Sequence, residues 1–110
     1  MIMQKPELFD VVELLIDLPG QGLQARARGA IVDVYDDAYE VEFADEMGET
    51  IALVPLTVRQ FVVVWRSASK SWVSVVEKFE ALMVTLPEEM LVEVFDFARN
   101  AYSGRSQSIP

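Results

Sequence analysis

The acidic side chains of this sequence are its most numerous chemically active groups, and one pair has a spacing that carboxylate enzymes use. Glu40 and Glu42 flank Val41, so both glutamates should lie on the same face of a β-strand. Paired carboxylates act as general acid and base when they face a cleft that separates their pKa values. A solvated strand face is the simpler interpretation, so this pair does not predict an enzyme.

Two further acidic groups fall at turns, where they could hold a hard cation. Calcium and magnesium need several converging oxygen ligands, and the spacing here does not match a calcium-binding helix–loop–helix. Aspartates are common as solvated turn residues, so we expect no metal site. The residues are Asp33, Asp36 and Asp37 in one group, and Asp45, Glu46 and Glu49 in the other.

The sequence contains neither histidine nor cysteine, which removes the commonest general base and zinc ligand as well as thiol chemistry. Residues 67–74 contain four serines close to Lys70, and a serine–lysine dyad would use such a pair. No oxyanion-hole motif accompanies them, and small hydroxyl residues are common in hinges. Gly20-Gln21-Gly22 lacks the lysine and the following helix of a phosphate loop. We predict no catalytic residue and no cofactor.

The negative charge is unevenly distributed along the chain. Of the net charge of −9, residues 1–66 contribute −7 (12 acidic, 5 basic) and residues 67–110 contribute −2 (6 acidic, 4 basic). This field would repel a phosphate backbone and attract a basic protein, so direct nucleic-acid binding is not expected. No leader peptide is apparent, and the longest apolar run, Phe61–Trp65, is far too short to span a membrane. We expect a cytoplasmic protein.

The hydrophobic period changes near residues 66–71, which predicts two structural parts. Up to Trp65 the apolar residues mostly alternate, whereas after Ser71 they recur every three or four positions. We predict an α+β fold: a five-stranded antiparallel barrel like that of Src-homology-3 (SH3) domains in residues 1–66, then a helical hairpin and a loose tail in residues 67–110. The expected strands are Phe9–Ile16, Ala27–Tyr35, Tyr39–Ala44, Glu49–Val54 and Phe61–Trp65, with a helical turn at Thr57–Gln60.

The predicted helical hairpin occupies residues 71–103. Ser71 is the expected N-cap of a first helix that Trp72 opens. Pro87, followed by two glutamates, suits the start of a second helix, and Gly104 suits its end. Each helix carries an apolar stripe. The stripes are Trp72, Val75, Val76, Phe79, Leu82, Met83 and Leu86 in the first helix, and Met90, Leu91, Val94, Phe95, Ala98, Ala101 and Tyr102 in the second.

Three segments of the first part resemble an uncharacterised family of small bacterial domains. They are Phe9-Asp10-Val11-Val12-Glu13-Leu14 with Leu18-Pro19 and Gly22-Leu23, then Gly29-Ala30-Ile31-Val32-Asp33-Val34-Tyr35, then Tyr39-Glu40-Val41-Glu42-Phe43. The resemblance covers residues 8–64 and implies the SH3-like barrel, but the family has no assigned activity. Its members often lie beside toxin–antitoxin genes, which implies a partner of that kind.

The start of the second helix resembles a short bacterial antitoxin-like motif, in which Leu-Pro-Glu-Glu is followed by Val-x-Asp-Phe. Here the motif reads Leu86-Pro87-Glu88-Glu89, then Val94-Phe95-Asp96-Phe97. The resemblance implies a chain that accompanies or neutralises a basic, toxin-like protein.

Two apolar residues on each predicted helix fall outside the stripes and would be costly if left in water. A hairpin of this size has little core of its own, so we expect assembly through the helices, most simply as a two-fold homodimer. Acidic residues of the barrel would then steer a basic protein partner. The residues expected in assembly are Val73, Val84, Val92 and Phe97, and those expected to steer the partner are Glu40, Glu42, Asp45 and Glu46.

An alternative function is a binding module for a small ligand, a peptide or a cation. Aromatic side chains could line a groove between the barrel and the hairpin, and such grooves hold organic ligands or proline-rich peptides. The two tryptophans could equally pack one part against the other. The aromatic residues concerned are Tyr35, Tyr39, Trp65 and Trp72.

Overall fold

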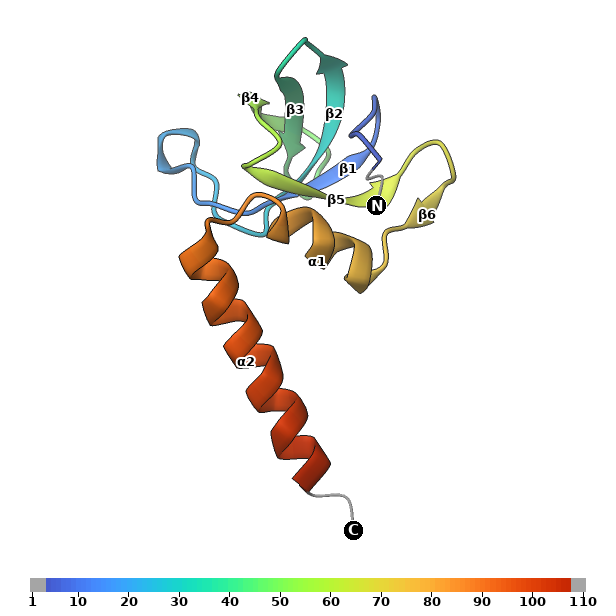
Figure 1. Cartoon of the computed structure of the whole chain (residues 1–110). Helices are drawn as coiled ribbons and strands as arrows, with labels where there is room; N and C mark the ends of the chain where they lie inside the picture. Colours follow the sequence, from blue (N-terminus) through green and yellow to red (C-terminus); the bar gives the residue numbers. More distant parts are fainter. Residues whose placement is uncertain (1–3, 108–110) are drawn as a thin grey trace.

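The computed structural model describes residues 4–107, which form one antiparallel sheet followed by two α-helices (Figure 1). The predicted α+β class is thus confirmed for this part of the chain. Across the sheet the strands run in the order β4-β3-β2-β1-β5-β6. The bounds are Val11–Leu14 (β1), Arg28–Val34 (β2), Tyr39–Ala44 (β3), Thr50–Leu56 (β4), Phe61–Arg66 (β5), Ser71–Trp72 (β6), Val75–Met83 (α1) and Glu88–Gln107 (α2), with a short 3-10 helix, η1, at Pro19–Gln21.

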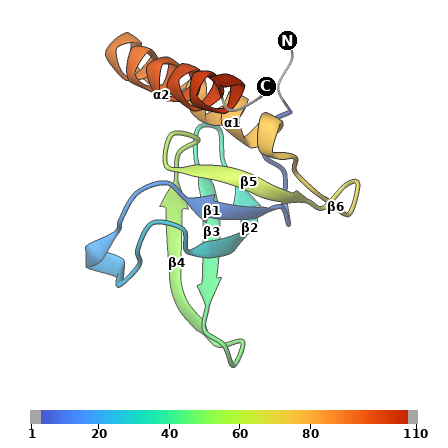
Figure 2. The same ribbon diagram turned by 90° about the horizontal axis from the view of Figure 1, so that it is seen from below.

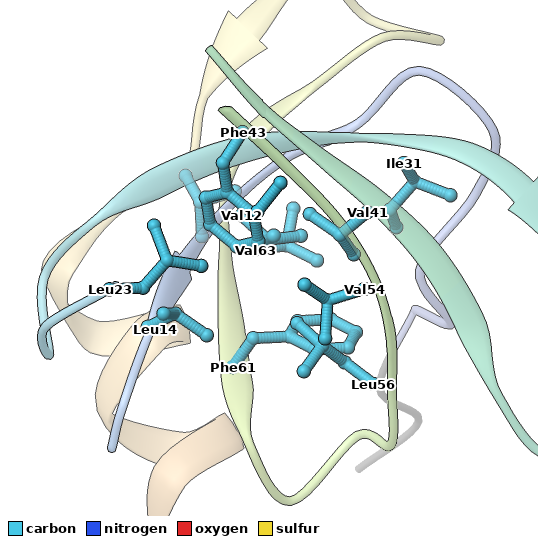
Figure 3. Packing of buried hydrophobic residues seen from close by; sticks show 12 residues of the cluster. Val12, Leu14, Leu23, Ile31, Val41, Phe43, Val54, Leu56, Phe61 and Val63 are labelled. Atoms are coloured by element: carbon cyan, nitrogen blue, oxygen red, sulfur yellow. The ribbon is translucent and has the colours of Figure 1, made fainter. Parts of the chain in front are cut away.

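The core is built from the residues that face inward from the strands, and in β3 these alternate with more exposed residues. In β3, Val41 and Phe43 are buried, whereas Glu42 between them is only half-buried. Tyr39 packs edge-on against Phe61, with ring centroids 5.6 Å apart. Figure 3 shows Val41, Phe43 and Phe61 converging with other buried side chains from several strands. The buried cluster consists of Val12, Leu14, Leu23, Ile31, Val41, Phe43, Ala52, Val54, Leu56, Phe61, Val63 and Val73.

The β3–β4 hairpin depends on a glycine and an aspartate at its turn. Gly48 has a φ of 84°, which glycine adopts without the steric cost of a side chain. The carboxylate of Asp45 accepts the backbone N–H groups of Met47 and Glu49, both at 2.9 Å. The turn therefore fixes the register in which β3 meets β4.

The sheet is open, so the prediction of a closed five-stranded barrel is wrong. Closure would require the two edges of the sheet to pair, and these edges are β4 and β6. Strand β6 is absent from the five predicted strands. Its residues, Ser71 and Trp72, pair with Arg66 and Trp65 and so occupy the outer side of β5. A two-residue edge strand offers too little backbone to close a barrel against β4.

The first helix starts later than predicted because Ser71 and Trp72 belong to β6. Lys70 adopts a φ of 52° in the turn that folds these residues back along β5. Ser74, not Ser71, is the N-cap of α1, and its hydroxyl accepts the backbone N–H of Glu77 at 3.1 Å. Val73 lies between β6 and α1. It donates its N–H to the Val64 carbonyl at 2.9 Å and is buried in the core, so its predicted place on an outer helical face is wrong.

The two helices do not form the predicted antiparallel hairpin. Helix α1 packs on β5, whereas α2 extends away from the sheet (Figures 1 and 2). Helix α2 also continues through Gly104 to Gln107, so the predicted stop at Gly104 is wrong. A mid-helix glycine costs only about 1 kcal/mol, which the flanking turns can offset. The result is an elongated molecule of 53 × 30 × 29 Å.

Candidate interaction surfaces

An apolar face runs along most of α2 and is left exposed. Three aromatic rings stand out: Phe95 is 63%, Phe97 79% and Tyr102 74% exposed. Figure 1 shows α2 projecting away from the sheet. Helical spacing places eight residues on this face, which we name the α2 apolar face. They are Met90, Leu91, Val94, Phe95, Phe97, Ala98, Ala101 and Tyr102.

The polar side of α2 has an uneven charge distribution. Residues 88–97 carry four acidic side chains, and residues 98–107 carry two arginines. Arg99 pairs with Asp96 at 2.6 Å and lies over the ring of Phe95 at 5.4 Å from its centroid. Acidic residues at the start and a basic residue in the last turn agree with the helix dipole. Helix α2 is therefore negative in its first half and positive in its second.

Helix α1 also leaves apolar side chains in solvent. Ala81 and Lys78 line grooves beside Val62, which places this side of the helix against β5. Val75 and Val76 are 75% and 66% exposed. Val75 and Val76 of the predicted stripe are thus open to solvent, whereas Leu82 and Met83 further along α1 are half-buried. An ion pair between Arg66 and Glu77 joins this helix to β5.

A groove of about 510 Å³ lies in the bend between α1 and α2, and we name it the elbow groove. Its walls are apolar except for one glutamate. Phe79 contributes from α1 and Leu86 from the connection, and α2 contributes Met90, Glu93, Val94, Phe97 and Ala98. The groove is continuous with the α2 apolar face, because four of its residues belong to both.

The remaining residues predicted for assembly lie in three different places. Phe97 shares the elbow groove with Met90 and Val94, so the interpretation that it lies off the main stripe is wrong. Seven and three residues of separation put these side chains on one side of a helix. Val92 is exposed on another side of α2, and Val84 is exposed at the C-cap of α1. The structure therefore brings Phe97, but not Val84 or Val92, onto the α2 apolar face.

The acidic residues predicted to steer a partner divide into two kinds. Glu40 and Glu42 share the outer face of β3 and are half-buried, with Glu42 accepting the Thr50 hydroxyl at 2.5 Å. Glu46 is exposed at the tip of the β3–β4 hairpin, whereas Asp45 is engaged in holding that turn. Glu40, Glu42 and Glu46 are thus the members whose charge is most available to a partner.

Tyr35 shows the effect of this negative surface on a neighbouring group. Its hydroxyl donates to Glu40 at 3.4 Å. Partial loss of hydration raises the pKa of Tyr35, and the charges of Glu40 and Asp33 raise it further because they repel the phenolate. The end of the β2–β3 hairpin therefore has a negative potential.

The four aromatic residues predicted to line one groove are not gathered around a common groove. Trp65 and Trp72 face each other across β5 and β6, and the guanidinium of Arg28 lies 5.5 Å from the Trp72 ring centroid. Tyr39 packs into the core, and Tyr35 lies exposed at the end of β2. None of these four residues lines the elbow groove or either of the two grooves beside α1.

A second enclosed site, of about 240 Å³, lies between the N-terminal segment, β5 and α1. Val63 and Val73 contribute apolar surface, and Lys5, Lys78 and Glu77 contribute charge at its lining. We name it the N-terminal groove. Its composition suits a small apolar molecule better than a highly charged one. The third, a shallower groove of about 260 Å³, lies on the other side of α1, next to Glu13 and Leu15 on the sheet.

A buried carboxylate that sequence reasoning missed ties these elements together. Asp10 is fully buried and accepts backbone N–H groups of Glu7 at 2.9 Å and Ser67 at 2.8 Å. Arg66 lies 3.6 Å from Asp10 and 2.8 Å from Glu77 of α1. One guanidinium thus connects the start of β1 with α1.

Within the part of the chain that the structure describes, no three acidic side chains gather closely enough to hold a metal ion. Of the two α-helices in residues 4–107, neither combines the length with the hydropathy that a bilayer crossing requires.

The fold and its surfaces define a small α+β protein with an open antiparallel sheet and a projecting amphipathic helix. Residues 8–63, which span β1 to the first half of β5, match the family described as Domain of unknown function (DUF4926), and the chain belongs to that family. Comparison with curated proteins and with solved structures finds no match. Both α-helices lie outside the matched residues, so the α2 apolar face is carried by the part of the chain beyond the family match.

Proposed function

We propose that this chain is a non-enzymatic interaction protein of the cytoplasm, which assembles through α2 and presents its acidic sheet to a basic protein. The exposure of the α2 apolar face is the observation that carries the proposal. Its three aromatic rings alone offer on the order of 300–500 Å² of exposed surface. Together with Met90, Leu91 and Val94 on the same side of the helix, they form an apolar patch of a size that is often an interaction site.

The charge distribution supports self-assembly through the helices and partner binding through the sheet. Residues 1–66 carry −7, so contact between the sheets of two copies is repulsive and the helices are the favourable place for self-contact. The same charge attracts a basic partner, with Glu40, Glu42 and Glu46 available on the surface. The resemblance of residues 86–97 to an antitoxin-like motif supports a toxin-like protein as that partner.

Light scattering on the wild type and on Phe97→Glu tests this function. We expect a dimer for the wild type and a monomer for Phe97→Glu, because the substitution places a charge on the α2 apolar face, beside Met90 and Val94 in the elbow groove. Ser103→Glu is the matched control: position 103 is exposed on the same helix but outside that face, so the dimer should persist. A monomeric wild type at tens of micromolar would contradict the proposal.

A second candidate function is the binding of a small ligand in the N-terminal groove. Its volume of about 240 Å³ and its lining by Val63 and Val73 are the observations that favour it. If light scattering shows a monomer for both the wild type and Phe97→Glu, the result would favour this function, because ligand binding in the N-terminal groove does not need α2.

A further inference from the structure

We infer that the α2 apolar face and the elbow groove are covered by α2 of a second copy, running antiparallel to the first. The inference rests on the self-assembly in the proposed function and adds the identity of the occupant and its direction. Three features of the described chain carry it: the charge along α2, the position of the acidic sheet at one end of that helix, and the shape of the elbow groove.

The charge along α2 favours the antiparallel direction. Residues 88–97 hold four acidic side chains and residues 98–107 hold two arginines. Antiparallel pairing places each acidic half opposite a basic half, whereas parallel pairing places acid opposite acid and base opposite base. Opposite charges across a helix pair stabilise it and like charges destabilise it, and the two helix dipoles add to the same preference.

The acidic sheet lies near the N-terminal end of α2 (Figure 1). Parallel pairing would bring two modules of −7 side by side. Antiparallel pairing puts them at opposite ends of helices that are about 30 Å long, at a rise of about 1.5 Å per residue. That distance exceeds the Debye length of about 8 Å at physiological ionic strength, so the mutual repulsion is largely screened.

The elbow groove fits the C-terminal half of a second α2. Phe79 of α1, Leu86 and Met90 form the part of its wall beside the start of α2, where the end of an antiparallel partner arrives. On that half of the helix, Ala98 and Ala101 are small enough to allow close approach of the two backbones. Tyr102, which is 74% exposed, then supplies a ring to fill the groove.

Disulfide cross-linking in the full-length chain tests the direction, and the absence of native cysteine makes each introduced thiol unique. Ala98→Cys lies near the middle of α2, so antiparallel pairing brings its two copies within the roughly 7 Å Cα separation that a disulfide tolerates. Met90→Cys would lie roughly 20 Å from its counterpart. Val94→Cys mixed with Ala101→Cys should cross-link more than either variant alone, because positions 94 and 101 are equidistant from the middle.

The outcomes separate direction from assembly. We expect mild oxidation to convert most of Ala98→Cys, and little of Met90→Cys, to covalent dimer. A dimer by light scattering whose Met90→Cys variant cross-links with itself would overturn the antiparallel direction and leave the proposed function standing, as would a dimer whose Ala98→Cys variant does not cross-link. A wild-type monomer would overturn both. Circular dichroism of each reduced variant confirms that the fold is retained.

Discussion

At the scale of single residues, partners that are close in sequence were predictable and distant ones were not. The alternation around Val41 correctly placed Glu40 and Glu42 on the outer side of β3. Asp10 gave no comparable signal, because its acceptor role depends on Ser67, which is 57 residues away. Asp45 looked like a free charge in the sequence, yet its carboxylate is used by backbone N–H groups within the next four residues. Acidic character alone therefore does not separate structural from available carboxylates.

Replacing Glu40 with glutamine should lower the raised pKa of Tyr35. Loss of hydration raises that pKa first, and Glu40 contributes next through its charge and its hydrogen bond. Because the folded-state pKa lies above the unfolded value of about 10, the group's contribution to folding is complete below that pH and is lost as the pH rises from there through the raised folded-state pKa. Phenolate absorbance in a Tyr39→Phe, Tyr102→Phe background measures the titration. An unchanged midpoint in Glu40→Gln would show that Glu40 is not a cause.

At the scale of elements, the hydrophobic period correctly predicted whether most segments form strands or helices, but it did not predict which surfaces pack against each other. The switch of hydrophobic period predicted strands before helices, and the alternation in β3 predicted its buried residues, Val41 and Phe43. Strand β6 was missed because two residues, Ser71 and Trp72, are too short a segment to show a period. The hairpin was predicted from two amphipathic stripes, but stripes do not say which surface covers them. Here neither α-helix covers the other, and both apolar sides are open.

The stability of the fold should depend far more on Asp10 than on Glu77, although both pair with Arg66. Asp10→Asn removes a fully buried charge partner and a carboxylate that holds two N–H groups, so we expect a loss of about 2–4 kcal/mol in the free energy of unfolding. The Glu77 side chain is 44% exposed, and Glu77→Gln should cost less than about 1 kcal/mol. Urea unfolding of both variants gives the comparison, and equal losses would argue against it.

At the scale of the whole molecule, the chain combines a self-contained sheet with a helix that has no packing of its own. The buried cluster lies within the sheet and includes only Val73 from the segment after β5. Helix α2 adds length and apolar surface but no buried core to the described chain. Because most helical stability in proteins comes from tertiary packing, α2 is the element whose order should depend on assembly.

Hydrogen exchange measured by mass spectrometry should therefore distinguish the two parts of the chain. In the wild-type dimer we expect slow exchange both in β1–β5 and in residues 88–107. In Phe97→Glu the sheet should stay protected, whereas residues 88–107 should exchange nearly as fast as an unfolded peptide, because an unpacked helix of this length is marginal in water. Ser103→Glu should match the wild type, and dilution of the wild type should reproduce the variant's pattern. Persistent protection of α2 in a monomeric Phe97→Glu would mean that the helix is stable without a partner, and its exposed aromatic rings would then need another explanation.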